Sequence, residues 1–419
     1  MGCWESQEED QRAVTMTTLP ILRHDVQISV HQEDGESYLV LHDPFSFADG
    51  PIMVHSDMVD VLQSCDGITT IAQLAEAANV EVDGPEMTRL ILFLRQMDEM
   101  GYFEGASYEQ RKLNELEAWS ALSERPAVCA GATYPAEEAE LRNYMGTLLE
   151  NDVVTQRHSD VVTQRRSDDV AGTSPVAILM PHIDFRVAPA VYGPGFAPLQ
   201  DHDADLVIMV GTSHYWADDA FILTEKDFTT PLGTVKTDVD LVRALSESLP
   251  GVAKTDIAHR PEHSLELHLV GLQHTWEGRS YTVVPILVTM AALEDGVLEQ
   301  AAEVLREAVA KSGRKAIWLI SGDLAHVGKK FGDDLPAQAF IGDVKGADQR
   351  LLEHLRTASP EAYHSEIVAT DHAYRVCGHA PTVLALTAVR PTSGSVVAYD
   401  IWDETETQSA VSFASVLFH

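Results

Sequence analysis

The stretch AIWLISGDLAH (316–326) places six mostly apolar residues of strand length directly before Asp323 and His326. The same design recurs in VAILMPHID (176–184) and in LVIMVGTSH (206–214). A short apolar run of this kind is typical of a strand that is buried on both faces of a sheet. The pattern therefore indicates a buried sheet whose strands end in polar side chains.

Helical patterns alternate with apolar runs through the C-terminal two-thirds of the chain. The strand-length runs lie at 176–180, 206–211, 283–288, 316–321 and 396–399. The helical patterns between them lie at 238–248, 299–311 and 343–358. Such alternation is typical of an α/β domain in which helices surround a mostly buried sheet.

The polar residues that follow these strands are the candidates for function. Ligands bind beyond the carboxyl ends of strands in α/β sheets, so we expect His182, His214, Asp323 and His326 to converge. Cys377 precedes a predicted helix, where a thiolate is stabilised and becomes a better nucleophile or metal ligand. Singly, each residue has a plainer explanation as a loop residue, a helix cap or a core thiol. Their repetition at three strand ends favours a shared pocket.

One further histidine joins these candidates. His263 opens a predicted helix within EHSLE (262–266). Other histidines lack such a context, and we predict a surface position for them: His202, His274, His354, His364 and His419.

Composition limits the classes of function. The net charge of -36, from 65 acidic and 29 basic residues, repels phosphate backbones and argues against general nucleic-acid binding. The four cysteines are scattered, which favours a reducing compartment and a cytoplasmic location. There is no apolar run of transmembrane length and no secretory signal, so no membrane association is expected. MGCWES (1–6) fits the loose myristoylation pattern, but the acidic run Glu8–Asp10 favours a disordered tail instead.

The first third of the chain has a different pattern. Apolar or alternating runs at 26–30 and 38–42 flank the turn EDG (33–35), as in a β-hairpin, and three short helical patterns follow. This order predicts a small α+β domain of the winged-helix kind. The chain then divides into a disordered acidic tail (1–18), a winged-helix-like domain (19–105), a linker helix (106–124) and the α/β domain (125–419), with a low-complexity insertion (151–174). The insertion contains an eight-residue tandem repeat, to which we assign no catalytic role.

Seven short motifs occur in the order and approximate spacing of the Memo family. They are PHID (181–184), GTSH (211–214), TPLG (230–233), EHSLELHL (262–269), VVPILV (283–288), SGDLAHVG (321–328) and CGHAP (377–381). The stretch RPAVCAGATYPAEEAELRNYM (125–145) also resembles the beginning of that family. Residues 125–419 are thus similar to Memo proteins, which are also called AmmeMemoRadiSam system protein B.

The resemblance implies a fold, a metal and partners. Memo-like proteins share the LigB-like fold of class III extradiol dioxygenases. By motif, the implied metal ligands are His182, His214 and Cys377, and the implied catalytic residues of the same pocket are His263, Asp323 and His326. Iron or copper is the implied ion, and two histidines with one thiolate leave open positions for substrate or dioxygen. The family name implies radical-SAM and AMMECR1-type proteins as partners.

The sequence departs from the family pattern at two places. The family commonly has His-Ala-Gly where this chain has His182-Ile183-Asp184, so a carboxylate stands beside the first implied ligand. Asp184 is either a residue that supports a ligand or a replacement ligand. Tyr215 stands where the family has a second histidine. Both changes bear on the identity of the metal and substrate more than on the fold.

The N-terminal domain resembles the PqqD-like family. The resemblance rests on LQSCDGITT (62–70) and MDEMGYF (97–103). It implies a module that binds a peptide or a partner enzyme. The alternative is a generic winged-helix spacer.

Three functions remain open at this point. The first is a metal-dependent redox enzyme of the oxygenase type, with acid–base work by the pocket histidines and Asp323. The second is a metal-free hydrolase or acyl transferase in which Cys377 is the nucleophile and His326 or His214 the base. The third is a non-catalytic protein that binds a peptide or partner. The substrate does not follow from the fold.

Overall fold

The computed structural model describes residues 17–150, 174–216, 218–294 and 296–419. The chain divides into two compact units, Met1–Ala121 and Leu122–His419. Most of the predicted tail (1–18) and of the predicted insertion (151–174) lies outside the described residues. We describe the two units separately.

The N-terminal unit contains the predicted hairpin. Strands β1 (Gln27–Glu33) and β2 (Glu36–His42) pair antiparallel, and β3 (Ile52–His55) completes a sheet in the order β1-β2-β3. Asp34 and Gly35 both have positive φ, of 51° and 83°. That geometry suits a two-residue hairpin turn, which matches the twist of the flanking strands.

The sheet shares a small core with three helices, α2 (Val59–Gln63), α3 (Ile71–Ala77) and α4 (Pro85–Glu99). Helix α5 (Ala106–Ser120) follows and contributes no residue to this core. The core contains Leu41, Leu94 and Phe103, each fully buried, and Cys65. Cys65 therefore packs as a small apolar residue, as its helical spacing predicts. The buried Arg23 pairs with Asp43 at 3.0 Å in the same unit.

The C-terminal unit is built on one large sheet. Within the described residues it has 11 strands, with the main path β12-β14-β5-β11-β6-β10-β9-β8-β4. The central strands β5 (Ala177–Met180), β11 (Ala316–Ser321), β6 (Leu206–Thr212) and β10 (Thr282–Val288) are mutually parallel. The other strands are β4 (Glu124–Pro126), β7 (Phe221–Leu223), β8 (Asp227–Thr230), β9 (Gly233–Thr237), β12 (His326–Gly328), β13 (Gly394–Glu404) and β14 (Ser409–Phe418). The predicted α/β fold is confirmed.

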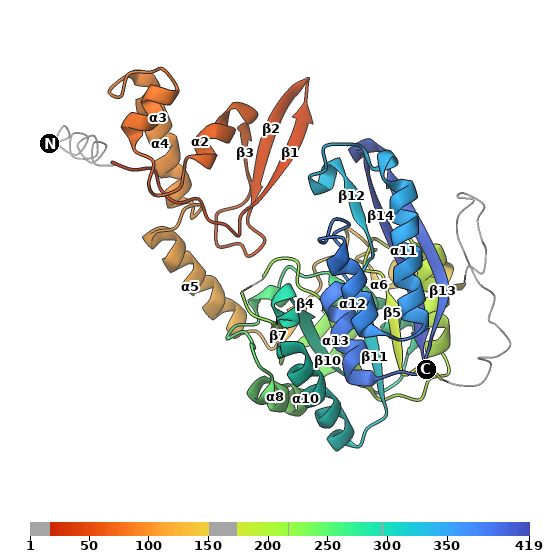
Figure 1. The fold of residues 1–419 in the computed structure, drawn as a ribbon. Helices are drawn as coiled ribbons and strands as arrows, with labels where there is room; N and C mark the ends of the chain where they lie inside the picture. Colours follow the sequence, from red (N-terminus) through yellow and green to blue (C-terminus); the bar gives the residue numbers. More distant parts are fainter. Residues whose placement is uncertain (1–16, 151–173, 217, 295) are drawn as a thin grey trace. The chain divides into compact units, whose positions relative to one another are not determined.

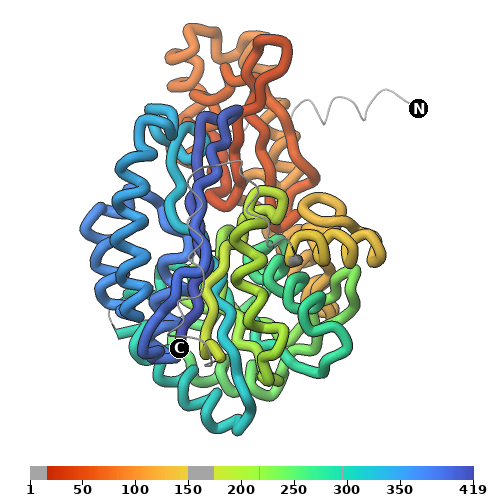
Figure 2. Tube along the Cα trace, turned by 90° about the vertical axis from the view of Figure 1, so that its right-hand side faces the viewer, coloured from red at the N-terminus to blue at the C-terminus, as the bar shows by residue number. Residues whose placement is uncertain are grey.

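The sheet is not parallel throughout, because its C-terminal part is a long hairpin. Strands β13 and β14 pair antiparallel along most of their length, and Figure 2 shows them as the two blue strands that run side by side. Strand β14 joins the central strands by pairing antiparallel with β5. The last strand of the chain thus lies next to the first central strand.

Helices cover both faces of this sheet. They are α6 (Glu138–Glu150), α7 (Pro189–Phe196), α8 (Val239–Ser248), α9 (Ser264–Thr275), α10 (Val297–Ser312), α11 (Ile341–Arg356), α12 (Pro360–Ala369) and α13 (His379–Val389). Figure 1 shows α12 and α13 in front of the central strands. None of the helices in the described ranges is long and apolar enough to cross a membrane.

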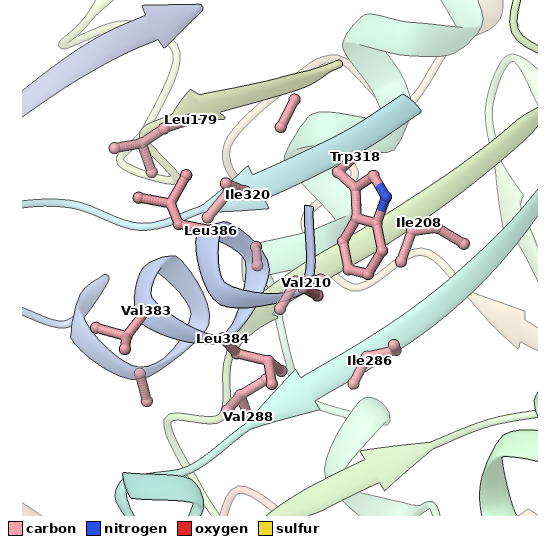
Figure 3. Packing of buried hydrophobic residues seen from close by; sticks show 14 of the residues in the cluster. Leu179, Ile208, Val210, Ile286, Val288, Trp318, Ile320, Val383, Leu384 and Leu386 are labelled. Atoms are coloured by element: carbon pink, nitrogen blue, oxygen red, sulfur yellow. The ribbon is translucent and has the colours of Figure 1, made fainter. Parts of the chain in front are cut away.

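Alternation along the strands explains why both faces are covered. In β6, Ile208 and Val210 belong to one hydrophobic cluster, whereas Val207 and Met209 belong to another on the opposite face. Figure 3 shows the first cluster, in which Leu384 and its neighbours from α13 lie against side chains of the strands. Strands buried on both faces need the continuous apolar runs that the sequence contains.

Candidate metal centre

The ends of three adjacent strands bring the predicted residues together. Strands β5, β11 and β6 are neighbours and parallel, so the residues after them meet at one edge of the sheet. The rings of His182 and His214 are 4.9 Å apart, and the ring of His263 lies 5.2 Å from His182 and 4.7 Å from His214. His263 is the residue just before α9, and this helix packs over β6 and β11.

A close approach of two glycines brings Cys377 to this edge. A Cβ placed on Gly322 would lie 2.3 Å from the Cα of Gly378, so neither position has room for a side chain. The Gly378 amide donates to the Asp323 carbonyl at 3.0 Å, and the Asp323 amide donates to the Cys377 sulfur at 3.3 Å. The glycines of the GDLAH and CGHAP motifs therefore allow the contact that places the thiol.

His182, His214 and Cys377 form a possible ligand set. One ligand atom from each of them lies within 4.8 Å of the others. His182 Nε2 is 3.2 Å from the Cys377 sulfur. Ser321 donates its hydroxyl hydrogen to the Ser264 carbonyl, so its oxygen accepts from His182 Nδ1 at 3.1 Å. That bond fixes the tautomer and leaves the Nε2 lone pair of His182 facing the thiol.

Glu262 is the central residue that our sequence reasoning missed. Its buried carboxylate lies 2.9 Å from His214 Nδ1 and 3.3 Å from His263 Nδ1. It also accepts from the backbone amides of His214, His263 and Ser264. Despite the opposing effect of burial, His214 and the other donors hold the pKa of Glu262 well below its usual range. The carboxylate thus directs the Nε2 atoms of both histidines away from itself, as a carboxylate does behind metal-binding histidines.

The position of Glu262 depends on a buried ion pair. Arg125 and Glu266 have side chains that are 1% and 0% exposed, and Arg125 Nη1 lies 2.5 Å from the Glu266 carboxylate. Arg125 also donates to the backbone carbonyls of His259 and Glu262. Glu266 in turn accepts from Tyr134 and from two backbone amides. Every strong hydrogen-bonding group of the pair is used, so the pair holds the segment that carries Glu262.

Asp323 and His326 form a second set with the same thiol. Together with Cys377 they offer ligand atoms within 4.8 Å of one another. His326 Nδ1 faces the carbonyls of Leu324 and Arg375, at 3.2 and 3.1 Å, so this nitrogen carries the hydrogen. Nε2 of His326 is then free, 4.0 Å from the Asp323 carboxylate. Burial raises the pKa of Asp323 to about 6 and lowers the pKa of His326 to about 4.

The expected activation of the thiol by a helix N-terminus is wrong for the protein without a metal. Helix α13 begins two residues after Cys377, but burial and the Asp323 carboxylate raise the pKa of the thiol well above its usual value. Desolvation and a nearby negative charge both favour the neutral thiol. A cation would be needed to reverse that balance, because a coordinating thiol loses its proton.

Asp184 and Tyr215, the two departures from the family pattern, differ in their position relative to this centre. Asp184 forms an ion pair with Arg186 and belongs to none of the possible ligand groups found among the described residues. The Tyr215 ring lies 6.3 Å from the ring of His214, and burial, followed by Glu262, raises its pKa to about 12. Asp184 therefore does not replace a ligand, whereas Tyr215 stands beside one.

A pocket opens next to the thiol. It has a volume of about 360 Å³, and its lining includes Cys377, Val288, Met290, His372 and Arg375. This size suits a small molecule.

None of the five histidines that we expected at the surface is exposed, and His274, His354 and His419 are half-buried. His202 is only 6% exposed, and its ring hydrogen-bonds the Pro175 carbonyl at 3.0 Å. His364 is half-buried and contacts His379. Neither position shows a periodic signal in the sequence, because each is buried by segments distant in the chain.

Comparison with known proteins agrees with the motifs. The family model described as Memo-like protein matches residues 125–417. A MEMO1 family protein of Aquifex aeolicus is 24% identical over 400 residues, covering 93% of this chain and 97% of its own. A MEMO1 family protein of Thermus thermophilus is 28% identical over 326 residues, covering 77% of this chain and 90% of its own. The solved structure of an uncharacterized Escherichia coli K12 protein covers 57% of this chain and 98% of its own, with 16% identity and a TM-score of 0.33. The family model spans well over half of the chain, and the chain therefore belongs to the Memo family.

Proposed function

We propose that the C-terminal unit holds one iron or copper ion through His182, His214 and Cys377 and acts as a redox enzyme of the oxygenase type. The observation that carries the proposal is the hydrogen bonding behind the ligands. Ser321 fixes the tautomer of His182, and Glu262 fixes that of His214, so that both Nε2 lone pairs are available near the thiol. A LigB-like fold, as the motifs imply, accords with this chemistry.

The donor set fits such an ion. Two imidazoles and one thiolate suit iron or copper and leave coordination positions open. The bound ion would supply Lewis-acid and redox chemistry. The thiol must lose its proton when the ion binds, so metal affinity should rise with pH.

The remaining residues of the pocket are suited to handling protons. Asp323 has a raised pKa and lies 3.7 Å from His182 Nε2, where it can hold a proton near neutral pH. His326 presents an unprotonated Nε2 beside it. The ring of His263 stacks on that of His214 at 4.7 Å, with the Glu262 carboxylate behind it. We assign these three residues to acid–base steps on a small substrate in the adjoining pocket.

Elemental analysis of anaerobically purified protein tests the proposal. We expect nearly one equivalent of iron or copper in the wild type and a loss of most of it in His182→Ala and Cys377→Ala. The exposed His31→Ala in β1 serves as a control for removal of a histidine and should keep its metal. Wild-type protein that holds no metal, even after reconstitution with either ion, would refute the proposal.

A metal-free reaction with Cys377 as nucleophile is the alternative for the same site. The half-buried, uncharged thiol disfavours it. Alkylation of the metal-free protein distinguishes the metal-dependent function from the reaction with Cys377 as nucleophile. Rapid modification of Cys377 at neutral pH would support its role as a nucleophile. Modification that stays slow until high pH would support its role as a metal ligand.

The N-terminal unit suggests a second, separate role in partner binding. Strand β1 lies at the edge of its sheet, all seven of its residues are exposed, and the side chains of Ile28 and Val30 are 48% and 66% exposed. Such an edge can take up an extended peptide as an additional strand. We propose a PqqD-like role in which β1 binds a peptide, or a partner of the radical-SAM or AMMECR1 type. The 400 residues aligned with the Aquifex protein exceed the length of the C-terminal unit, which indicates that the relative shares the N-terminal unit as well.

Binding assays with the full chain test this role. Val30→Pro removes a backbone donor of β1, and we expect it to abolish capture of a purified radical-SAM or AMMECR1-type protein. The surface change Val30→Thr keeps the backbone donor and should retain binding. No binding by the wild type would refute the role.

A further inference from the structure

Three histidines form a cluster outside the centre described above. His364 belongs to α12, His372 lies in the turn after it, and His379 is the first residue of α13. His364 Nδ1 and His379 Nε2 are 2.9 Å apart. The ring of His379 lies 5.0 Å from that of His364 and 5.5 Å from that of His372.

The three rings differ in their exposure and in their hydrogen-bond partners. His379 is 1% exposed, and its Nδ1 has no hydrogen-bond partner among the described residues. His364 is half-buried and His372 is exposed. No hydrogen bond to the ring of His372 is present in the described ranges of the chain, so this ring can turn toward the other two. The two facing imidazole nitrogens, one of them on a buried ring, need a physical explanation.

Two imidazole nitrogens that face each other at this distance either share a hydrogen or share a cation. Two ligands that each lie about 2 Å from one ion are themselves roughly 3 Å apart. The separation of 2.9 Å between His364 Nδ1 and His379 Nε2 fits that spacing. For a cation to bind, the hydrogen between the rings moves to the second nitrogen of its own ring.

We propose that His364, His372 and His379 form a second metal site, which takes a borderline divalent cation such as Zn²⁺, Ni²⁺ or Cu²⁺. His364 and His379 are already in place as two nitrogen ligands, and His372 turns in from its exposed position as the third. All-imidazole sites suit these ions, whereas Ca²⁺ and Mg²⁺ prefer oxygen ligands. This site has no thiolate, which distinguishes it chemically from the centre at Cys377.

Access and charge also favour a cation here. His364 lines a pocket of about 250 Å³ whose other lining residues include Glu294, Glu299 and Glu361. Three carboxylates around one opening raise the local concentration of cations. His372 lines the pocket that contains Cys377, so the second site lies between two openings.

Titration of the full-length, metal-free protein with Co²⁺ under anaerobic conditions tests the proposal. Cobalt bound by a thiolate gives a charge-transfer band, and cobalt bound by imidazoles alone does not. We expect the wild type to bind two equivalents, one with the band and one without. His364→Ala and His372→Ala should each lose the equivalent without the band and keep the other.

Two further proteins separate this proposal from the one before. Cys377→Ala should lose the charge-transfer band and still bind one equivalent through the histidine cluster. His354→Ala, a histidine of α11 outside the cluster, should bind like the wild type. The second site is refuted if His364→Ala or His372→Ala binds as much cobalt as the wild type. Absence of the band in the wild type would count against the centre at Cys377 alone.

Discussion

The buried carboxyl of Asp348 should make the protein less stable as the pH rises. Asp348 lies in α11 and is 1% exposed. One of its oxygens accepts from the Tyr399 hydroxyl at 2.8 Å, and the other has no hydrogen-bond partner in the part of the chain that the structure describes. Burial raises the pKa of this carboxyl from 3.8 to about 6. The Ser412 and Tyr399 hydroxyls only partly offset the lost solvation of the carboxylate in such a place.

The sign and the size of the effect follow from that pKa. Because the pKa of Asp348 is higher in the folded state, the protonated carboxyl contributes stability that is fully present below about pH 4. That contribution is lost as the pH rises toward 6, and the loss is complete above it. A difference of about two pKa units, at about 1.4 kcal/mol each, gives a penalty of roughly 3 kcal/mol at neutral pH.

Asp348→Asn should remove the penalty, since the amide keeps an acceptor for Tyr399 and carries no charge. We expect the variant to unfold in urea with a free energy up to about 3 kcal/mol higher than the wild type at pH 7.5, and nearly equal to it at pH 4. Asp343→Asn, an exposed residue in the first turn of the same helix, should change stability by less than about 1 kcal/mol. A variant that is no more stable than the wild type at pH 7.5 would show that the carboxylate is adequately solvated.

Three further substitutions test the support of the metal centre. Arg125→Lys should weaken metal binding at least tenfold in a chelator competition, since the lysine cannot hold the segment of Glu262. Arg23→Lys, in the buried pair of the N-terminal unit, is the control and should destabilise that unit while leaving metal affinity unchanged. Equal metal affinities of the two variants would contradict this. Ser321→Ala frees Nδ1 of the first histidine and should weaken metal binding by about 10- to 100-fold in the same assay, and an unchanged affinity would refute the tautomer argument. Gly378→Ala places a Cβ 2.9 Å from the backbone at the end of β11. The variant should have a free energy of unfolding lower by about 1–3 kcal/mol and a weaker affinity for the metal. A stable variant with full metal affinity would show that the close approach is not needed.

Hydrogen bonds between distant segments account for most of what the sequence reasoning missed. Glu262 stands beside His263 in the sequence, where it looks like one more acidic residue of an acidic protein. It becomes central because its oxygens reach His214, 48 residues earlier in the chain. Arg125 is equally ordinary in the sequence, and its carboxylate partner is 141 residues away.

Local surroundings also reversed the expected property of one residue. Position near a helix start predicts an activated Cys377, yet burial and Asp323 raise the pKa of its thiol. Asp184 follows the first implied ligand in the chain, but its side chain pairs with Arg186 instead of entering the site. Electrostatic effects of this kind depend on the number and direction of neighbouring groups, which spacing along a chain does not reveal.

The sequence by itself determined the class of fold and the edge of the sheet that carries function. Strands buried on both faces must be continuously apolar, and residues after parallel strands must emerge at one edge, so the runs before His182, His214 and Asp323 were sufficient. The motifs were likewise sufficient for the family, which the comparison confirms. Only the tertiary structure decided which nitrogen of each histidine is free, which carboxylate lies behind it and which groups surround the thiol. These properties arise from contacts within about 3 Å between segments far apart in the chain, because side-chain packing and hydrogen bonding in the folded state set them.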